Sequence, residues 1–144
     1  MAVDVAVEAV IGRPVGEVAA YAGDPTNAPR WYVNIESVEW RTPGPVTVGS
    51  RMDFVAKFLG RRIAYTYEVT DLVPGERLVM QTAQGPFPMR TTYTWVQTGE
   101  GTRMTLRNDG EPSGFSKLAA PVMEVAMRRA MTKDLAALKR ILES

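Results

Sequence analysis

Side chains able to carry out acid–base chemistry are few in this chain, and they are carboxylates and tyrosines. The 144 residues contain no histidine and no cysteine. This double absence removes Ser-His and Cys-His catalysis, a histidine general base and nearly every zinc or non-haem iron site, because these need imidazole or thiolate groups. No pair of carboxylates has the spacing of a hydrolase, and no glycine-rich loop has the strand-to-helix context of a phosphate site. We therefore assign no catalytic residue and no metal ligand, and we expect no cofactor.

Asp134 has the most unusual position of the carboxylates. It belongs to the stretch MEVAMRRAMTKDLAALKRIL near the end of the chain. On a helical wheel Met123, Met127, Met131 and Leu135 of this stretch fall on one side. Asp134 lies about 20° from the direction of Met123, well inside the apolar arc. An unpaired carboxylate in such a place is costly, so we expect it to have a partner.

Two roles are open for Asp134. The favoured role is structural: it accepts hydrogen bonds from backbone N–H groups at the start of a short helix, in RPVGE or DPTNA, or it pairs with a buried arginine. In that case, replacing it with Ala lowers stability by about 1–3 kcal/mol without abolishing ligand binding. In the second role, a raised pKa lets Asp134 transfer protons as an acid/base residue.

Methionines and tyrosines gather on the two surfaces that should face each other across the fold. Each methionine alone is explained as a residue that fills a gap in the core, but the set favours a deformable pocket of about 300 Å³ or more. Tyrosine hydroxyls need partners when buried, and they either reach water or face a ligand. Trp31, and with less weight Tyr32, either lies at the pocket mouth or plugs the core. The candidate ligand-binding residues are Trp31, Phe54, Phe58, Tyr65, Tyr67, Met80, Met89, Tyr93, Met104, Met123, Met127 and Met131.

The remaining charged residues favour solvent-exposed surfaces. Arg90, Arg103 and Arg107 alternate away from the proposed pocket face. Glu111, after the last predicted strand, is either solvated or at the pocket rim. The final helix has a basic face, which is most simply a solvated surface and is also compatible with transient contact with an anionic membrane or an acidic partner. That face consists of Arg128, Arg129, Lys133, Lys139 and Arg140.

The elements that position these residues follow from residue alternation and turn chemistry. Residues 3–8 alternate between valine and other residues, which predicts a strand and not a signal peptide. Prolines and a capping aspartate in GRPVGEV and DPTNAPRWY predict two short helices. From about residue 34 to 109, turn sequences such as LGRR and VPGER separate six predicted antiparallel strands. A long helix is predicted from about residue 113 to 143, and it either begins or bends at Pro121.

Composition restricts the function classes further. With 45% hydrophobic and 23% charged residues, the chain has the composition of a soluble globular protein, and residues 1–144 fit one domain. The formal net charge of +1 gives no broad electrostatic reason to bind nucleic acid. No uncharged apolar run approaches transmembrane length. We expect a cytoplasmic protein with a small, mostly uncharged partner.

The order of elements resembles the START-like (SRPBCC) superfamily, and within it the polyketide cyclase/dehydrase and lipid-transport group. The stretches that carry the resemblance are RPVGEVAAYAGDPTNAPRWY, VGSRMDFVAKFLGRRIAYTYEVTDLVPGERLVMQT and MTKDLAALKRILE. The resemblance implies an α+β helix-grip fold over residues 1–144, in the order β-α-α, six β-strands, α, with a curved antiparallel sheet wrapping the last helix. It also implies a cavity for an apolar ligand, but it supplies no reaction, because members bind lipids, sterols, hormones or polyketides and only some are catalysts.

Three function hypotheses are consistent with the sequence. The first is a binding protein for a small hydrophobic molecule, such as a lipid or a polyketide-like aromatic compound. The second is a cofactor-independent cyclase or dehydratase that uses tyrosine or Asp134 to move protons. The third is a protein-interaction module resembling chaperone co-activators of the same fold. The absence of histidine argues against the enzyme, and the methionine- and tyrosine-rich face argues against a module that uses only its surface.

Overall fold

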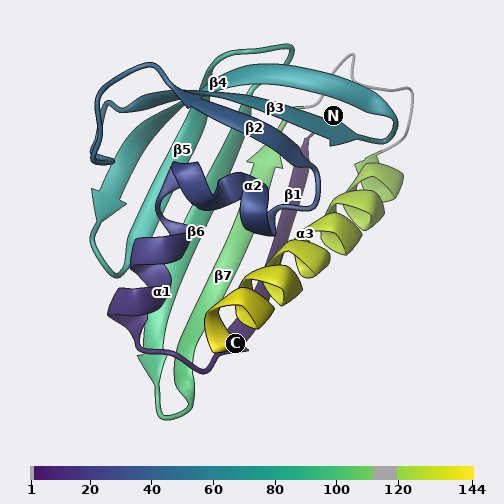
Figure 1. The fold of residues 1–144 in the computed structure, drawn as a ribbon. Helices are drawn as coiled ribbons and strands as arrows, with labels where there is room; N and C mark the ends of the chain where they lie inside the picture. The colour runs from purple at the N-terminus through teal and green to yellow at the C-terminus, as the bar shows by residue number, and fades with distance from the viewer. Residues whose placement is uncertain (1, 112–119) are drawn as a thin grey trace.

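One antiparallel sheet and one long helix form the frame of the protein (Figure 1). The computed structural model describes residues 2–111 and 120–144. Within them, seven strands lie in the order β1-β7-β6-β5-β4-β3-β2. The element order and the curved sheet around the last helix confirm the predicted helix-grip fold. The elements are β1 (Val3–Ile11), α1 (Val15–Ala22), η1 (Pro25–Asn27), α2 (Ala28–Trp31), β2 (Ile35–Trp40), β3 (Arg51–Phe58), β4 (Arg61–Val73), β5 (Arg77–Gln84), β6 (Met89–Thr98), β7 (Gly101–Gly110) and α3 (Ala120–Glu143).

The helix starts differ in detail from the sequence prediction. The second short helix divides into a 3-10 turn, η1, followed by α2. Asp24 caps η1 as predicted, since its carboxylate accepts a hydrogen bond from the N–H of Thr26 at 3.0 Å. In the long helix, Pro121 is the second residue of the described part, Ala120–Glu143. Residues 113–119 of the predicted helix lie outside the described residues.

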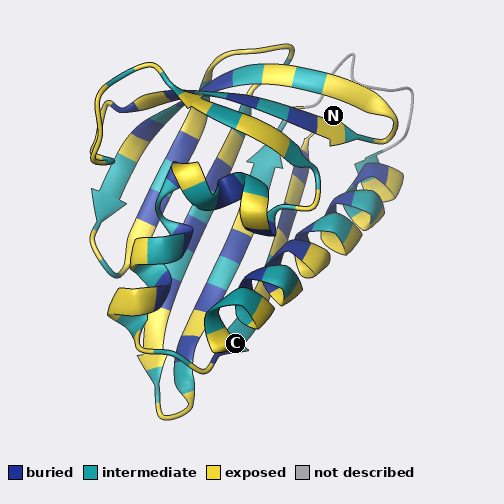
Figure 2. Cartoon of the chain, viewed as in Figure 1, coloured by how far each residue is buried: buried dark blue, intermediate teal, exposed yellow. Residues whose placement is uncertain are grey.

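Irregular pairing bends the sheet around α3. The register shifts in the β2–β3 pair between Ile35 and Ser37, and twice in the β4–β5 pair. Such shifts bend a strand and increase its twist. The concave face carries the apolar residues of each strand and the convex face the polar ones, so Figure 2 shows alternating burial along the strands. The buried strand residues include Met52, Phe54, Val69, Leu78, Met80, Trp95, Met104 and Leu106.

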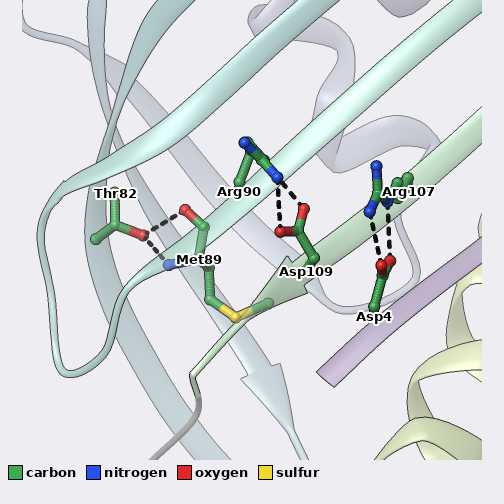
Figure 3. Close-up of polar contacts among 6 residues, drawn as sticks. All are labelled: Asp4, Thr82, Met89, Arg90, Arg107 and Asp109. Carbon is green, nitrogen blue, oxygen red and sulfur yellow. Dashed lines mark hydrogen bonds and ion pairs between the residues drawn. The ribbon is translucent and has the colours of Figure 1, made fainter. Parts of the chain in front are cut away.

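Ion pairs cross the strands on the convex face. Arg90 binds Asp109 and Arg107 binds Asp4, each through two guanidinium nitrogens (Figure 3). These arginines therefore face away from the helix, as the alternation predicts. Both pairs are partly exposed, so each is worth about 1 kcal/mol or less. The Arg107 guanidinium hydrogen-bonds Asp4 and lowers the pKa of that carboxyl.

Side chains of α3 bind backbone groups that the edge strand β1 leaves unpaired. β1 has a neighbour in the sheet on one side only, β7. The outer edge of such a strand exposes free N–H and C=O groups that can pair with another chain. Carboxylates and cations from α3 occupy three of them and the N–H of Gly12, the residue after β1, which covers this edge and fixes the helix along it. The bonds run from Asp4 N–H to Glu124 (2.9 Å), from Arg128 to Ala6 O (2.9 Å), from Lys139 to Val10 O (2.6 Å) and from Gly12 N–H to Glu143 (2.7 Å).

The close approach of the β6–β7 turn to the end of β1 can be tested by substitution. Gly101 has a φ of +131°, and a Cβ at this position would overlap the carbonyl oxygen of Ile11 at the end of β1. Gly99, two residues earlier, has open space around it. We expect Gly101→Ala to lower the free energy of unfolding by about 1–3 kcal/mol, and Gly99→Ala to change it by less than about 0.5 kcal/mol. Urea unfolding of both variants measures the free energies of unfolding. Equal losses in the two variants would contradict the close approach of Gly101 to Ile11.

Candidate ligand-binding site

A pocket of about 170 Å³ lies between α3 and the concave face of the sheet. Its walls come from α3, from the inward-facing residues of β2 to β7, from the segment after α2 and from the β5–β6 loop. Most of the lining is apolar or aromatic. The lining residues are Tyr32, Asn34, Ile35, Phe54, Ala56, Phe58, Ile63, Tyr65, Tyr67, Met80, Thr82, Pro86, Phe87, Met89, Thr91, Tyr93, Asn108, Met123, Met127, Ala130, Met131 and Asp134.

The pocket is smaller than the sequence suggested. The expectation was about 300 Å³ or more, a common size for ligand sites, whereas the volume is about 170 Å³. Seven aromatic side chains and five methionines line the pocket and fill part of the space between helix and sheet. Methionine side chains rearrange easily, so the walls suit a pocket that adapts to its contents.

Ten of the twelve candidate ligand-binding residues lie in the lining, and Trp31 and Met104 do not. Trp31 is 1% exposed and packs at 4.2 Å between ring centroids on Tyr32. It fills the core behind the pocket, whereas its neighbour Tyr32, the less favoured candidate for the pocket mouth, lines the pocket. Met104 is fully buried beneath the lining. Whether the other ten bind a ligand stays a prediction.

Several lining residues were not among the candidates. Ala56, Ile63 and Thr91 follow the same alternation as the predicted residues on their strands, so the pattern could have identified them. Pro86 and Phe87 lie in the β5–β6 loop, where no periodicity indicates which side chains face inward. Thr82, Asn108 and Ala130 also follow the periodicity of their strand or helix, although their residue types carry no strong signal. Asn34 and Ile35 line the pocket because of the tertiary fold.

The β5–β6 loop is held against the pocket by two contacts. Thr82 Oγ1 accepts a hydrogen bond from Met89 N–H at 2.9 Å and donates one to Met89 O at 3.1 Å, which closes the base of the loop (Figure 3). Gly85 packs so closely on Tyr65 that an added Cβ would lie 2.9 Å from the Tyr65 Cβ. Pro86 and Phe87 follow directly and enter the lining.

Two groups of hydroxyls in the pocket wall are bonded to each other. The hydroxyls of Tyr32 and Tyr93 are 2.5 Å apart. The Thr91 hydroxyl donates to Asn108 Oδ1 at 2.6 Å, so the Tyr67 hydroxyl, 2.8 Å from Thr91 Oγ1, must be the donor in that contact. These bonds satisfy polar groups that would otherwise be costly to bury.

Burial raises the pKa of every tyrosine in these groups. Desolvation raises the pKa of Tyr67 to about 12, although its hydrogen bond with Thr91 acts in the opposite direction. Desolvation also raises the pKa of Tyr32, and the neighbouring Tyr93 phenol adds to the effect. These phenols are therefore neutral at physiological pH.

Tyr65 differs from the other pocket tyrosines because its hydroxyl has no hydrogen-bond partner among the described residues. Its ring stacks on Phe54, with centroids 5.5 Å apart and planes within 4°, and meets Tyr67 edge-on at 4.9 Å. The three rings form one aromatic wall. Desolvation raises the pKa of Tyr65 well above 10, so it presents a neutral hydroxyl to the pocket.

Asp134 lines the pocket and is 3% exposed. Its Oδ1 accepts a hydrogen bond from the backbone N–H of Val33 at 2.9 Å. A backbone donor was expected, but the expected location at the start of a short helix is wrong, because Val33 follows the end of α2. The α2–β2 connection passes beside α3 here and brings a free N–H to the carboxylate. Desolvation raises the pKa of Asp134 to about 7, partly opposed by the Val33 hydrogen bond.

The curved sheet around α3 and the pocket between them define a helix-grip protein. Residues 2–143 match the family described as polyketide cyclase / dehydrase and lipid transport, and the chain belongs to this family. A comparison with curated proteins found no match. None of the helices within the described residues is long and apolar enough to span a lipid bilayer.

Solved structures with low sequence identity share the fold. A START superfamily protein from Mycobacterium smegmatis superposes with a TM-score of 0.81 at 14% identity, covering 99% of this chain and 97% of that one. The TTHA0849 protein from Thermus thermophilus has a TM-score of 0.80 at 21% identity, covering 95% and 94%. The Zhui aromatase/cyclase from a Streptomyces species has a TM-score of 0.79 at 17% identity, covering 99% and 94%. At these identities the likeness concerns the fold alone.

The raised pKa of Asp134 predicts a pH-dependent stability. The carboxyl titrates near 3.8 when unfolded and at about 7 when folded. Below pH 3.8 both states are protonated and Asp134 contributes nothing. As the pH rises toward 7 the unfolded state loses its proton first, so stability falls, by an amount on the order of 4 kcal/mol.

Asp134→Asn tests this, because the amide oxygen can still accept from Val33 N–H while the titration is removed. We expect the variant to be more stable than the wild type at pH 8, and the advantage to shrink toward pH 4. Urea unfolding of both proteins across this range measures the difference. The same pH dependence in both would show that Asp134 titrates normally.

Proposed function

We propose that the protein binds a small, mostly apolar molecule in the pocket between α3 and the sheet. The observation that carries the proposal is the pocket itself, in which methionine and aromatic side chains from α3 and β3 to β6 enclose a volume of about 170 Å³. Such a concave apolar site with a few polar groups is the usual form of a small-molecule site. The family, whose description includes lipid transport and polyketide cyclase chemistry, supports the same class of ligand.

The pocket walls favour a compact ligand with an aromatic or branched body. The stacked Phe54 and Tyr65 rings present a flat surface, and Met123, Met127 and Met131 on α3 provide a deformable one. A ring placed between them gains dispersion contacts on both faces. A long acyl chain would need more room than the present volume, so the proposal favours a compact molecule over an extended lipid.

Two alanine-to-leucine substitutions on α3 test where the ligand binds. Ala130 lines the pocket, whereas Ala136 is exposed on the same helix. We expect Ala130→Leu to weaken binding of phenethyl alcohol, a neutral aromatic probe, at least tenfold, because the added carbons occupy the pocket. Ala136→Leu should leave the affinity within about twofold. Calorimetric titration measures both, and wild-type affinity in Ala130→Leu would place the ligand elsewhere.

Native mass spectrometry of protein purified from its own host is the complementary experiment. A small apolar molecule that co-purifies with the wild type and is lost in Ala130→Leu would support the proposal. Retention of the same molecule in Ala130→Leu would argue that it binds outside the pocket.

A second candidate function is a cyclase or dehydratase, and Asp134 is the observation that favours it. A carboxyl with a pKa of about 7 in an apolar pocket can both donate and accept a proton near neutral pH. The neutral Tyr65 hydroxyl lines the same pocket and can donate a hydrogen bond to a carbonyl oxygen. The polyketide cyclase / dehydrase description of the family agrees with this chemistry.

The two functions respond differently to loss of the polar groups. If the protein only binds, Tyr65→Phe, Tyr67→Phe and Asp134→Asn should each leave the affinity for phenethyl alcohol within about tenfold, since apolar contact supplies the affinity. If it is an enzyme, loss of a general acid–base group should slow turnover about 10²–10⁴-fold while binding survives. Incubation with poly-β-ketone substrates, followed by product analysis, would reveal such a rate loss.

A further inference from the structure

The pocket wall carries one ionisable carboxylate and no basic side chain among the described residues. Of the lining side chains, Asp134 is the one that can be charged at neutral pH, because the tyrosines titrate above pH 10. The basic residues of α3 nearest in sequence, Arg129 and Lys133, are exposed to solvent. Any charge that the described lining carries is therefore negative, and this lining disfavours carboxylate-bearing ligands such as fatty acids.

The hydrogen bonds of Asp134 are incomplete. Oδ1 accepts from Val33 N–H, and within the described part of the chain no other donor bonds to the carboxylate. An ionised carboxylate has room for several hydrogen bonds, so Oδ2 is available toward the pocket. No cationic side chain of the described residues compensates its charge, since desolvation and the Val33 bond account for its pKa.

Hydrogen-bond acceptors and aromatic rings surround the same end of the pocket. The charge of Asp134 contributes to the raised pKa of both Tyr32 and Tyr93, and the two hydroxyls share one hydrogen bond. Each phenol oxygen keeps lone-pair capacity for a further donor. The rings of Tyr32 and Tyr93 provide electron-rich faces, which attract cations in desolvated sites.

We propose that the pocket takes a small apolar amine, whose ammonium group binds Asp134 and the Tyr32–Tyr93 hydroxyl oxygens and whose apolar body lies among the methionines and aromatic rings. This inference rests on the proposed function, because it specifies the ligand of that pocket. An ammonium group supplies three N–H donors and one positive charge, which is what the carboxylate and the two phenol oxygens lack. A neutral ligand would leave the carboxylate either uncompensated or protonated.

The proposal has a pH consequence that follows from the groups facing Asp134. These are Tyr32 from the end of α2 and Tyr93 from β6, both neutral in this range, whereas Arg30 of α2 and Lys133 of α3 are exposed. Phenethylamine stays cationic up to about pH 9, so between pH 6 and 8 Asp134 is the group in the site that changes charge. With its pKa at about 7, the ionised fraction rises about tenfold over this range.

Three probes with one phenyl group and different charges test the proposal: phenethylamine, phenethyl alcohol and phenylacetate. We expect the amine to bind the wild type at pH 8 at least tenfold more tightly than the alcohol, and phenylacetate to bind more weakly than either. Amine affinity should fall about tenfold from pH 8 to pH 6, while alcohol affinity stays within about threefold. Calorimetric titration at both pH values gives all of these affinities.

Two variants assign the effect to Asp134. Asp134→Asn should reduce amine affinity at pH 8 at least tenfold and remove its pH dependence, with alcohol affinity within about tenfold. Glu8→Gln makes the same charge change on the exposed face of β1 and should leave all affinities within about twofold. In the wild type, a carboxyl NMR titration should show that saturating amine lowers the pKa of Asp134 and that saturating alcohol does not. This measurement does not depend on how well the Asp134→Asn variant folds.

The outcomes separate this inference from the proposed function. If the alcohol binds as tightly as the amine, or if amine affinity is the same at pH 6 and pH 8, the amine proposal is wrong and the apolar pocket stands. If phenylacetate binds most tightly, the charge argument is wrong. If none of the three binds at millimolar concentration, the proposed function fails together with this inference.

Discussion

The rest of the structure depends on how α3 is fixed along the edge strand β1. Three side chains of the helix bind backbone groups of that strand and a fourth, Glu143, binds the N–H of Gly12 just after it. These bonds cover a strand edge that could otherwise pair with another chain, and they set the position of the helix over the sheet. With α3 held beside β1, the space toward the far strands has to be bridged by long side chains. Methionines of α3 and aromatic residues of β3, β4 and β6 bridge it incompletely, and the pocket is the volume that remains.

The burial of Asp134 opposes stability at neutral pH. A leucine or methionine there would complete the apolar face of α3, since Met127, Met131 and Leu135 are all buried around it. The carboxylate instead receives one backbone hydrogen bond and has its pKa raised to about 7. Residues that cost stability while facing a pocket are characteristic of functional sites, because recognition or proton transfer needs a group that packing alone would exclude. The amine inference and the cyclase or dehydratase candidate both assign Asp134 such a task.

The sequence predicted the fold well and the site in part. Alternation placed Met80 and Tyr93 on the concave face, and the element order identified the helix-grip fold, because both depend on periodicity and turn chemistry. Trp31 and Tyr32 show where such reasoning fails: at the end of a four-residue helix, one residue decides which ring enters the pocket and which fills the core. The donor to Asp134 could not be assigned either, since two short helices supply several free N–H groups and only the tertiary fold selects Val33. The pocket volume depends on side-chain packing and on the β5–β6 loop, neither of which has a periodic signal.

The polar groups of the pocket divide into those that bond to each other and those that remain available. Because the Thr91 hydroxyl donates to Asn108, the Tyr67 hydroxyl must donate to Thr91. Both hydroxyl protons of this series of hydrogen bonds are therefore used within the pocket wall. Tyr32 and Tyr93 likewise use one of their two protons on each other. Asp134 Oδ2, the Tyr65 hydroxyl and the second hydroxyl proton of the Tyr32–Tyr93 pair then remain without partners among the described residues. Leaving a buried polar group unpaired is costly, so a bound molecule gains most by matching such positions, and its remaining surface needs only to be apolar.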